Sequence, residues 1–246
     1  MNKIPGTRIN KFLSEAGFCS RREADKLIDK NRVKINGEVP LIGTKVMPGD
    51  RVTVDKKIIN IGKEKFVYLA FNKPKGVVCT TDVKREKNNI IDYLNYPKRI
   101  FPIGRLDKPS QGLIFLTSDG DIVNKILRAS NDHEKEYLVT VDKSITKEFV
   151  QKMSSGLPIL ETITKKCEVE KIANKKFKIV LTQGLNRQIR RMCEYLNYEV
   201  KQLKRVRIMN INLDLREGEW RYFTAKELKE MHQILKKSTK TALWKI

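Results

Sequence analysis

The sequence has few of the residues that build metal sites or disulfide frameworks. Its 246 residues include only two histidines, His133 and His232. The four cysteines are too widely spaced to form a CxxC pair, so zinc ligands with the usual spacing are missing and we expect no metal. We expect these cysteines to be free thiols in a reducing cytoplasm. They are Cys19, Cys79, Cys167 and Cys193.

Long apolar runs and cofactor motifs are also missing. No segment approaches the run of about 18 apolar residues that a membrane helix needs, and the first residues lack the apolar stretch of a signal peptide. The sequence contains no phosphate-binding GxxxxGK[ST] loop, no GxGxxG after a strand and no GxSxG. We therefore expect a cytoplasmic protein that makes no use of a membrane. The sequence motifs of kinases, dehydrogenases and serine hydrolases are absent, which argues against those activities.

Positive charge is abundant. Lys and Arg number 51 against 29 Asp and Glu, which gives a formal net charge of +22. Such an excess indicates a polyanionic partner, and nucleic acid is the first candidate because neutralised phosphates release counterions. A basic surface that serves only solubility is the alternative. An acidic membrane is a weaker one, since no amphipathic segment with an exposed aromatic face is evident.

Residues 1–62 read as a small separate domain. Apolar residues at helical spacing from Ile9 to Ala16 predict a short helix that Gly17 ends, and a second helix begins after Ser20. Asn36-Gly37 predicts a hairpin whose second arm is residues 38–39, and residues 51–54 alternate as another strand. The charged stretch 55–65 has no period and reads as a linker.

A set of cations gathers around the junction of the two predicted helices. A helix start beside basic side chains suits a phosphate, although a solvated charged face is an equal alternative from the residues alone. The order of residues 7–39 closely resembles the S4 RNA-binding domain, which implies that these cations hold an RNA duplex or stem-loop. They are Arg8, Lys11, Arg21, Arg22 and Lys34.

The sequence pattern of residues 63–246 predicts a second, larger domain of the α+β class with a mixed or antiparallel sheet. Strands are expected over 67–71, 112–117, 137–141 and 177–181, and helices after Asp121 and over 186–196. Strands outnumber helices and are irregularly interspersed, which argues against a doubly wound sheet. The basic tail from about His232 is expected to be loosely ordered.

One carboxylate stands out by its setting. Asp107 lies in a glycine-bounded loop between two apolar segments, and Arg105 and Lys108 flank it. Cations within about 4–6 Å favour an ionised carboxylate, which can act as a nucleophile or a base. A structural aspartate that ties the loop to its neighbours is the alternative. His133 stands in a charged stretch, where a solvent-facing or RNA-contacting role is expected.

Four ordered motifs carry a second resemblance. Residues 104–121, GRLDKPSQGLIFLTSDGD, resemble the catalytic motif of the RsuA-type pseudouridine synthases, which also carry an amino-terminal S4 domain. Residues 73–76 match the family's KPxG turn, 136–137 its tyrosine strand and 184–192 its GxxRQIRRM segment. The similarity extends from about Thr7 to about Leu228. Residues 131–141 and 183–194 further resemble a subgroup that acts on large-subunit ribosomal RNA.

The resemblance implies an enzyme that breaks the uridine C1′–N1 bond, rotates the uracil and rejoins it through C5, without cofactor, metal or energy source. Asp107 matches the catalytic aspartate, Tyr137 would stack under the flipped base, and Arg190 would pair with Asp107. Whether Asp107 attacks C1′ or C6, or removes a ribose proton, stays open. Further residues are expected to hold the RNA, and Ile189 also to pack on Tyr137. They are Lys73, Arg105, Leu106, Lys108, Arg187, Gln188 and Ile189.

We expect a specific uridine in a stem-loop of 23S rRNA as the target, with tRNA as a possible second substrate and a monomer as the default state. RNA is usually read at loops, because the A-form major groove excludes side chains. One alternative is a non-catalytic RNA-binding or ribosome-assembly protein. Another is a DNA-binding regulator that uses the two amino-terminal helices as a helix-turn-helix, which leaves the larger domain without a role.

Overall fold

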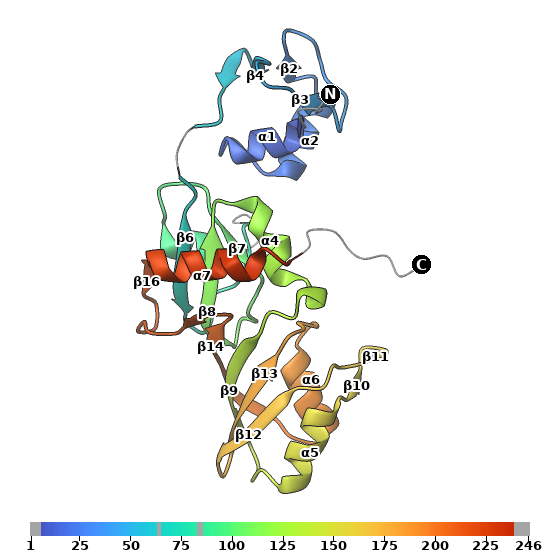
Figure 1. The fold of residues 1–246 in the computed structure, drawn as a ribbon, viewed down its shortest axis with the longest axis vertical. Helices are drawn as coiled ribbons and strands as arrows, with labels where there is room; N and C mark the ends of the chain where they lie inside the picture. Colours follow the sequence, from blue (N-terminus) through green and yellow to red (C-terminus); the bar gives the residue numbers. More distant parts are fainter. Residues whose placement is uncertain (1–5, 63–64, 83–85, 239–246) are drawn as a thin grey trace. The chain divides into compact units, whose positions relative to one another are not determined.

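The computed structural model describes residues 6–62, 65–82 and 86–238. The chain divides into two compact units, residues 1–66 and 67–246 (Figure 1). The domain boundary at residue 62 stays a prediction.

The smaller unit consists of two helices and short strands. Gly17, with φ +73°, follows the first helix, and Ser20 Oγ accepts a hydrogen bond from Glu23 N (3.1 Å) at the start of the second. Ile9, Leu13 and Ala24 are fully buried in its core. The elements are β1 (Thr7–Arg8), α1 (Ile9–Glu15), α2 (Arg21–Asp29), β2 (Val33–Ile35), β3 (Lys45–Val46), β4 (Val52–Val54) and β5 (Lys57–Ile59).

Two expectations for this unit were wrong. The Asn36-Gly37 turn forms, but its second arm is a single bridge between Ile35 and Glu38, and the strand partner of β2 is β4. Pro40 has no N–H with which to continue the ladder. Part of the expected linker is strand β5, which pairs with β4 after a left-handed turn at residues 55–56. Neither turn residue is Gly or Asn, so the usual sequence signal was missing.

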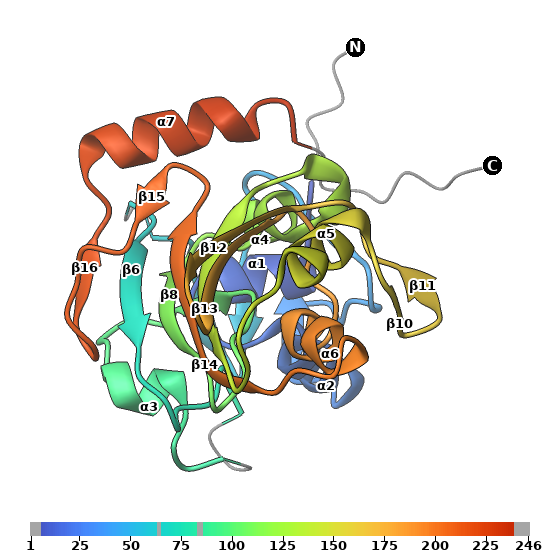
Figure 2. The same ribbon diagram turned by 90° about the horizontal axis from the view of Figure 1, so that it is seen from below.

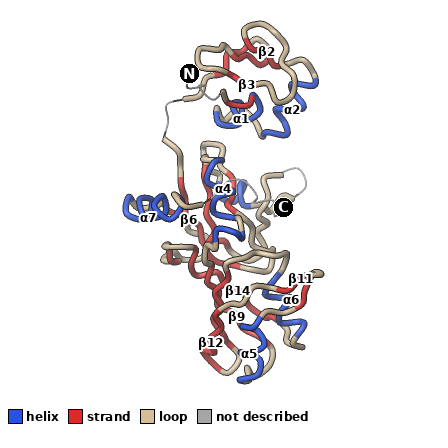
Figure 3. The backbone as a smooth tube through the Cα atoms, turned by 45° about the vertical axis from the view of Figure 1, so that its right-hand side comes forward, coloured by secondary structure: helices blue, strands red, loops and turns tan. Residues whose placement is uncertain are grey.

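The larger unit is built on a nine-stranded sheet with the order β12-β13-β9-β14-β8-β6-β16, to which β7 adds beside β8 and β15 beside β14. All pairings are antiparallel except that of β14 with β8. Figure 3 shows β12, β9 and β14 gathered at the end of the sheet away from β6. The strands are β6 (Tyr68–Lys73), β7 (Phe101–Ile103), β8 (Gln111–Thr117), β9 (Lys135–Val141), β12 (Glu168–Ala173), β13 (Lys176–Leu181), β14 (Val200–Ile208), β15 (Ile211–Asn212) and β16 (Trp220–Tyr222).

Helices cover both faces of this sheet, because its central strands are apolar on both sides. Along β8, Ile114 and Leu116 belong to one buried cluster, whereas Leu113 and Phe115 belong to another. The first cluster includes residues of α3, α5 and α6, and the second includes residues of α4 and α7. In Figure 2, α7 and α3 lie on opposite sides of β6 and β8. The helices are α3 (Ile90–Leu94), α4 (Gly120–Leu127), α5 (Lys147–Ser155), α6 (Gln188–Tyr195) and α7 (Ala225–Leu235), with a 3-10 turn at Ala129–Asn131 and a small hairpin of β10 (Pro158–Ile159) and β11 (Thr162–Ile163).

The α+β class is confirmed, and three local expectations need correction. The side chain that caps α4 is Asp119, whose Oδ1 accepts from Asp121 N (2.9 Å). His133 is 5% exposed, and its Nε2 lies 2.9 Å from Ser238 Oγ, so it does not face solvent. The tail is helical through Leu235, the end of α7; its last residues, 239–246, lie outside the described part of the chain.

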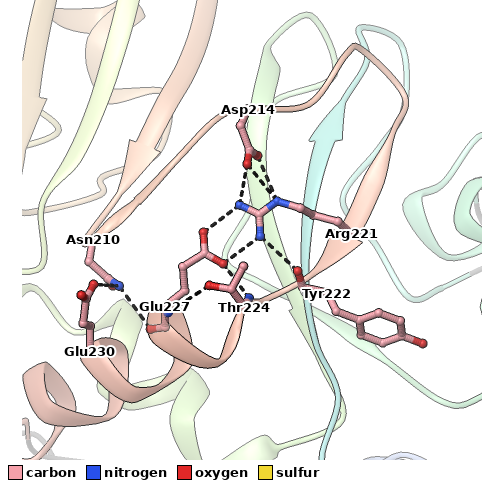
Figure 4. Close-up of polar contacts among 7 residues, drawn as sticks. All are labelled: Asn210, Asp214, Arg221, Tyr222, Thr224, Glu227 and Glu230. Carbon is pink, nitrogen blue, oxygen red and sulfur yellow. Dashed lines mark hydrogen bonds and ion pairs between the residues drawn. The ribbon is translucent and has the colours of Figure 1, made fainter.

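A charged network fixes the start of α7 against the edge of the sheet (Figure 4). Arg221 of β16 donates from Nε to both carboxylate oxygens of Asp214 (3.0 and 3.1 Å), and from Nη1 and Nη2 to the two oxygens of Glu227 (2.7 Å each). Thr224 and Glu227 complete a capping box at the first turn. Hydrogen bonds from Arg221 lower the pKa of Glu227. The helix that covers one apolar face is therefore tied to strand β16 at its amino-terminal end.

Gly112 allows the only parallel pairing in the described sheet. It pairs with Arg205 across β8 and β14, and its φ is +111°. A Cβ at this position would lie 2.2 Å from Arg205 O and 2.6 Å from Arg205 N. No side chain fits at that distance, so glycine is required where the two central strands meet.

We expect Gly112→Ala to destabilise the larger unit by about 3 kcal/mol or more, because it combines a strained φ with a backbone clash. Urea unfolding followed by tryptophan fluorescence measures the effect, since Trp220 lies in the same sheet. Gly184→Ala is the matched control, since no atom lies within 4 Å of its added Cβ; we expect a change within about 0.5 kcal/mol. An unchanged midpoint for Gly112→Ala would contradict the close approach.

Candidate active site

A cleft of about 950 Å³ opens between the loop that contains Asp107, strands β9 and β14, and the start of α6. Its lining brings together nine residues that the sequence analysis assigned to catalysis or RNA binding, although they come from three separate segments of the chain. They are Arg105, Leu106, Asp107, Lys108, Tyr137, Arg187, Gln188, Ile189 and Arg190.

Backbone hydrogen bonds hold the Asp107 loop against the turn that follows β6. Leu106 N donates to Cys79 Sγ (3.3 Å), and Gly76 N donates to Lys108 O (2.8 Å). Ser110 N donates to Asp107 O (2.9 Å) within the loop itself. Burial raises the pKa of the Cys79 thiol, which keeps it neutral. Asp107 is thus fixed on both sides before any substrate binds.

Arg190 is the cation closest to the Asp107 carboxylate. Its Nε lies 3.8 Å from Asp107 Oδ2, which makes an ion pair but not a hydrogen bond. Its Nη1 donates to Val200 O (3.2 Å) and its Nη2 to Ser110 Oγ (3.1 Å). Burial lowers the pKa of the Arg190 guanidinium, as does Arg187, while Asp107 opposes that shift. An arginine stays protonated in such a setting, so the carboxylate faces a fixed positive charge.

The other cations near the Asp107 loop lie further out, at the exposed rim of the cleft. Lys108 pairs with Glu86, at 3.5 Å between Nζ and Oε1, and both Lys108 and Arg105 are exposed. Arg187 lies at the start of α6 in a left-handed conformation, 4.0 Å from Glu194. These three side chains are at the rim of the cleft, where a phosphate backbone can reach them.

Tyr137 lies on β9 and is 8% exposed. It shares a buried cluster with Ile189, and the Arg205 guanidinium carbon lies 5.9 Å from the centre of its ring. The ring therefore lines the cleft between an apolar residue of α6 and a cation of β14. Such a ring offers a stacking surface to a base.

Two buried cations of the cleft escaped the sequence analysis. Arg205 is 4% exposed, and its Nε donates to Leu113 O (2.6 Å). Lys135 is 8% exposed, and its Nζ donates to His133 O (3.0 Å). Burial and the charge of Arg205 lower the pKa of Lys135 to about 8. The alternation of β9 was the available signal, because it puts Lys135 on the same face as Tyr137.

Lys73 needs a correction. It was expected at the RNA surface, but its side chain is fully buried and does not line the cleft. Its Nζ donates to Pro74 O and Val77 O, both at 2.8 Å. Lys73 therefore closes the turn after β6, and desolvation lowers its pKa.

The cations of the smaller unit are mostly exposed. Arg8, Arg21, Arg22 and Lys34 face solvent, with Arg21 and Arg22 in the first turn of α2. Lys11 is half-buried, and its Nζ lies 3.2 Å from Glu15 Oε1. Four of the five expected cations are therefore available to a phosphate backbone.

Within the described ranges, no three His, Cys, Asp or Glu side chains are grouped to hold a metal ion. No helix in the same part of the chain is long and apolar enough to cross a membrane.

Comparison with known sequences shows which protein family this cleft belongs to. The profile described as RNA pseudouridylate synthase matches residues 67–195, and the S4 domain profile matches residues 7–52. The chain belongs to the RNA pseudouridylate synthase family. The synthase also has the expected amino-terminal S4 domain, so the predicted family is confirmed.

Individual relatives of the chain are also pseudouridine synthases. Dual-specificity RNA pseudouridine synthase RluF of Escherichia coli (strain K12) is 57% identical over 94% of this chain and 80% of that protein. Ribosomal large subunit pseudouridine synthase B of Bacillus subtilis (strain 168) is 34% identical over 92% of this chain and 96% of that protein. A crystal structure of a pseudouridylate synthase, 28% identical, superposes with a TM-score of 0.67 and covers 92% of this chain and 99% of that one. The protein is an RNA pseudouridine synthase.

We expect Arg190→Met to slow pseudouridine formation by about 100-fold or more, because it removes the fixed charge beside Asp107. RNA affinity is expected to change little, since Arg190 is buried. Single-turnover rates and filter binding of the RNA separate the two effects. Arg216→Met is the control, because that side chain is 89% exposed and pairs with Glu219. Equal rates for both variants would contradict a role for the ion pair.

Proposed function

We propose that this synthase converts a specific uridine in a stem-loop of 23S rRNA to pseudouridine, with Asp107 as its catalytic carboxylate. One observation carries this proposal. Asp107 is half-buried in a cleft, 3.8 Å from the anchored Arg190 and among the same lining residues as Tyr137. A non-catalytic RNA-binding protein has no need of these three groups together.

An ionised carboxylate serves each chemical route that breaks the C1′–N1 bond. It can attack ribose C1′, add to uracil C6, or remove a ribose proton. In each case the Arg190 charge orients the carboxylate, and the bonds of the loop backbone limit its movement. The side chain of Asp107 is 34% exposed, which leaves it accessible to a nucleotide that enters the cleft.

The target uridine must leave its stack to reach this carboxylate. Flipping costs a few kcal/mol, which contacts to the RNA must offset. Tyr137 offers its ring to the flipped base, and Gln188 and Leu106 are further lining residues of the cleft. Arg105, Lys108 and Arg187 at the rim would hold the phosphates on either side of the displaced nucleotide.

The names of the relatives support the choice of RNA. The Bacillus subtilis relative is named for the large ribosomal subunit, and the Escherichia coli relative is named as dual-specificity. We therefore propose large-subunit rRNA as the main substrate and a tRNA as a second one. The S4 domain would dock on the stem next to the target loop through Arg8, Arg21, Arg22 and Lys34. A monomer in the cytoplasm stays a prediction of the sequence.

The decisive experiment is tritium release from 23S rRNA labelled with [5-³H]uridine, because C5 loses its hydrogen when it bonds to C1′. We expect release with the wild type and at least a 1,000-fold slower release, on the order of the effect of removing a key catalytic group, with Asp107→Ala. Asp107→Asn is the matched variant, since it keeps the shape and removes the charge.

Other outcomes are equally informative. Equal release from wild type and Asp107→Ala would contradict the role of Asp107. No release from either protein, with tight RNA binding retained, would favour a different RNA substrate or a non-catalytic RNA-binding protein.

For the S4 domain, we expect the double variant Arg21→Glu, Arg22→Glu to weaken binding of a stem-loop RNA by about 10-fold or more at low salt, with a shallower salt dependence. The rate at saturating RNA should stay the same. Lys56→Glu with Lys57→Glu is the control, since it changes the charge equally on exposed residues next to β4. Equal losses from both double variants would show an effect of net charge and not of the α2 surface.

A further inference from the structure

Positive charge in the cleft greatly exceeds negative charge. Among the described residues that line it, Asp107 is the single carboxylate. Arg190 pairs with that carboxylate, and three cations lie at the exposed rim. The remaining two, Lys135 and Arg205, are buried, and neither has a carboxylate within 4.0 Å in the described part of the chain.

The neighbouring arginine on the same strand shows the contrast. Arg207 of β14 is half-buried and pairs with Glu134 (2.9 Å) and Glu136 (3.2 Å). Those two glutamates flank Lys135 in the sequence, yet the structure pairs both with Arg207. Carboxylates are therefore present on β9 and next to it, but the cleft side of β9 and β14 has none.

A buried cation without a counter-charge is costly to the fold. Arg205 also leaves its Nη2 without a hydrogen-bond partner among the described residues. The protein nevertheless holds this group in place, through Leu113 O and the ring of Tyr137. A cation that destabilises the fold, is held in a fixed position and lies at a reaction cleft is typical of a group that stabilises negative charge on a ligand.

The reaction supplies such a charge. When the C1′–N1 bond breaks, its electron pair stays on the uracil, where it spreads from N1 to O2 and O4. C1′ is left as an oxocarbenium ion or as an ester of the attacking carboxylate. The uracil charge is consumed when C5 bonds to C1′, which releases the carboxylate from any such ester, and the C5 proton then leaves to give neutral pseudouridine. Between these two steps the detached uracil is an anion in the cleft that Asp107 lines. We propose that Lys135 and Arg205 stabilise this uracil anion and so act as further catalytic residues of the synthase.

The position of the two cations fits this role. Arg205 and Tyr137 are directly paired across β14 and β9, and Lys135 is two residues from Tyr137 on the same face of β9. A base that stacks on Tyr137 would therefore lie close to both charges. Coulomb interaction acts over several ångströms in a site with little water, so no direct hydrogen bond is required.

Titration of Lys135 should make the catalytic rate depend on pH. The pKa of Lys135 is lowered to about 8 by burial and by Arg205. Other ionisable groups around it are its neighbours Glu134 and Glu136, which pair with Arg207, and His133, whose pKa is also lowered by burial. The Asp107 carboxylate lines the same cleft. Lys135 is charged below its pKa and neutral above it. The catalytic rate should therefore fall as the pH rises through about 8.

The test is the pH profile of kcat/KM from pH 6.5 to 9 on stem-loop RNA. The wild type should lose about 10-fold between pH 7 and pH 9, in line with one ionisation near pH 8. Lys135→Arg stays charged throughout, so this alkaline fall should disappear. Lys135→Met should slow kcat at pH 7 by about 100-fold, the usual effect of losing one charge-stabilising group, without weakening RNA binding.

Arg207→Met is the matched control, because it removes a cation from the same strand but on the glutamate-paired side. It should keep the wild-type rate and pH profile. A flat wild-type profile, or full activity of Lys135→Met at pH 7, would overturn the inference. Arg205→Met should slow kcat at pH 7 by a similar factor, and its full activity would remove Arg205 from the inference. If either Met variant does not fold, the wild type and Lys135→Arg still decide the role of Lys135.

This inference rests on the proposed uridine isomerisation, and the two can fail separately. Tritium release by the wild type at pH 7 establishes the isomerisation, whatever the pH profile. Absence of that release would contradict the proposed function, and with it the source of the uracil anion.

Discussion

The ion pair between Asp107 and Arg190 is the interaction on which the site depends. A carboxylate in a cleft is useful only while it is held in the orientation that the reaction needs. Arg190 can provide that orientation because its own position is fixed by Ser110 and Val200. The Asp107 loop is fixed independently, through Cys79 and the turn after β6. Two separate supports thus hold the two charges at a set separation.

The central sheet determines which residues meet at this pair. Strand β14 lies between β9 and β8, so it connects the strand of Tyr137 to the strand that follows the Asp107 loop. Its close approach to β8 depends on Gly112, and the same pairing places Arg205 at the cleft. A change in strand spacing at Gly112 would therefore move the Arg205 charge in the cleft as well as lower the stability of the fold.

Motifs in the sequence were sufficient to find the residues of the cleft, because a catalytic pattern is local and its members carry recognisable neighbours. Asp107, Tyr137 and Arg190 line one cleft in the structure as those motifs implied. Burial was harder to predict. Lys73 occurs in a turn motif that looks exposed, yet two carbonyl oxygens in its own turn hold it inside. Arg205 lies outside the motifs, and only the register of β14 against β9 shows that it reaches the cleft.

Charge has different uses in different parts of this molecule. At the exposed surface, each cation contributes modestly to RNA affinity, and salt screens that contribution. Inside the cleft a cation is little screened, costs the fold free energy, and can repay that cost only against a negative charge nearby. Arg207 meets this requirement with glutamates of the protein, whereas Lys135 and Arg205 have no carboxylate within 4.0 Å among the residues that the structure describes. A stabilising partner for those two cations must therefore come from the bound RNA, at the step where the uracil itself becomes negative.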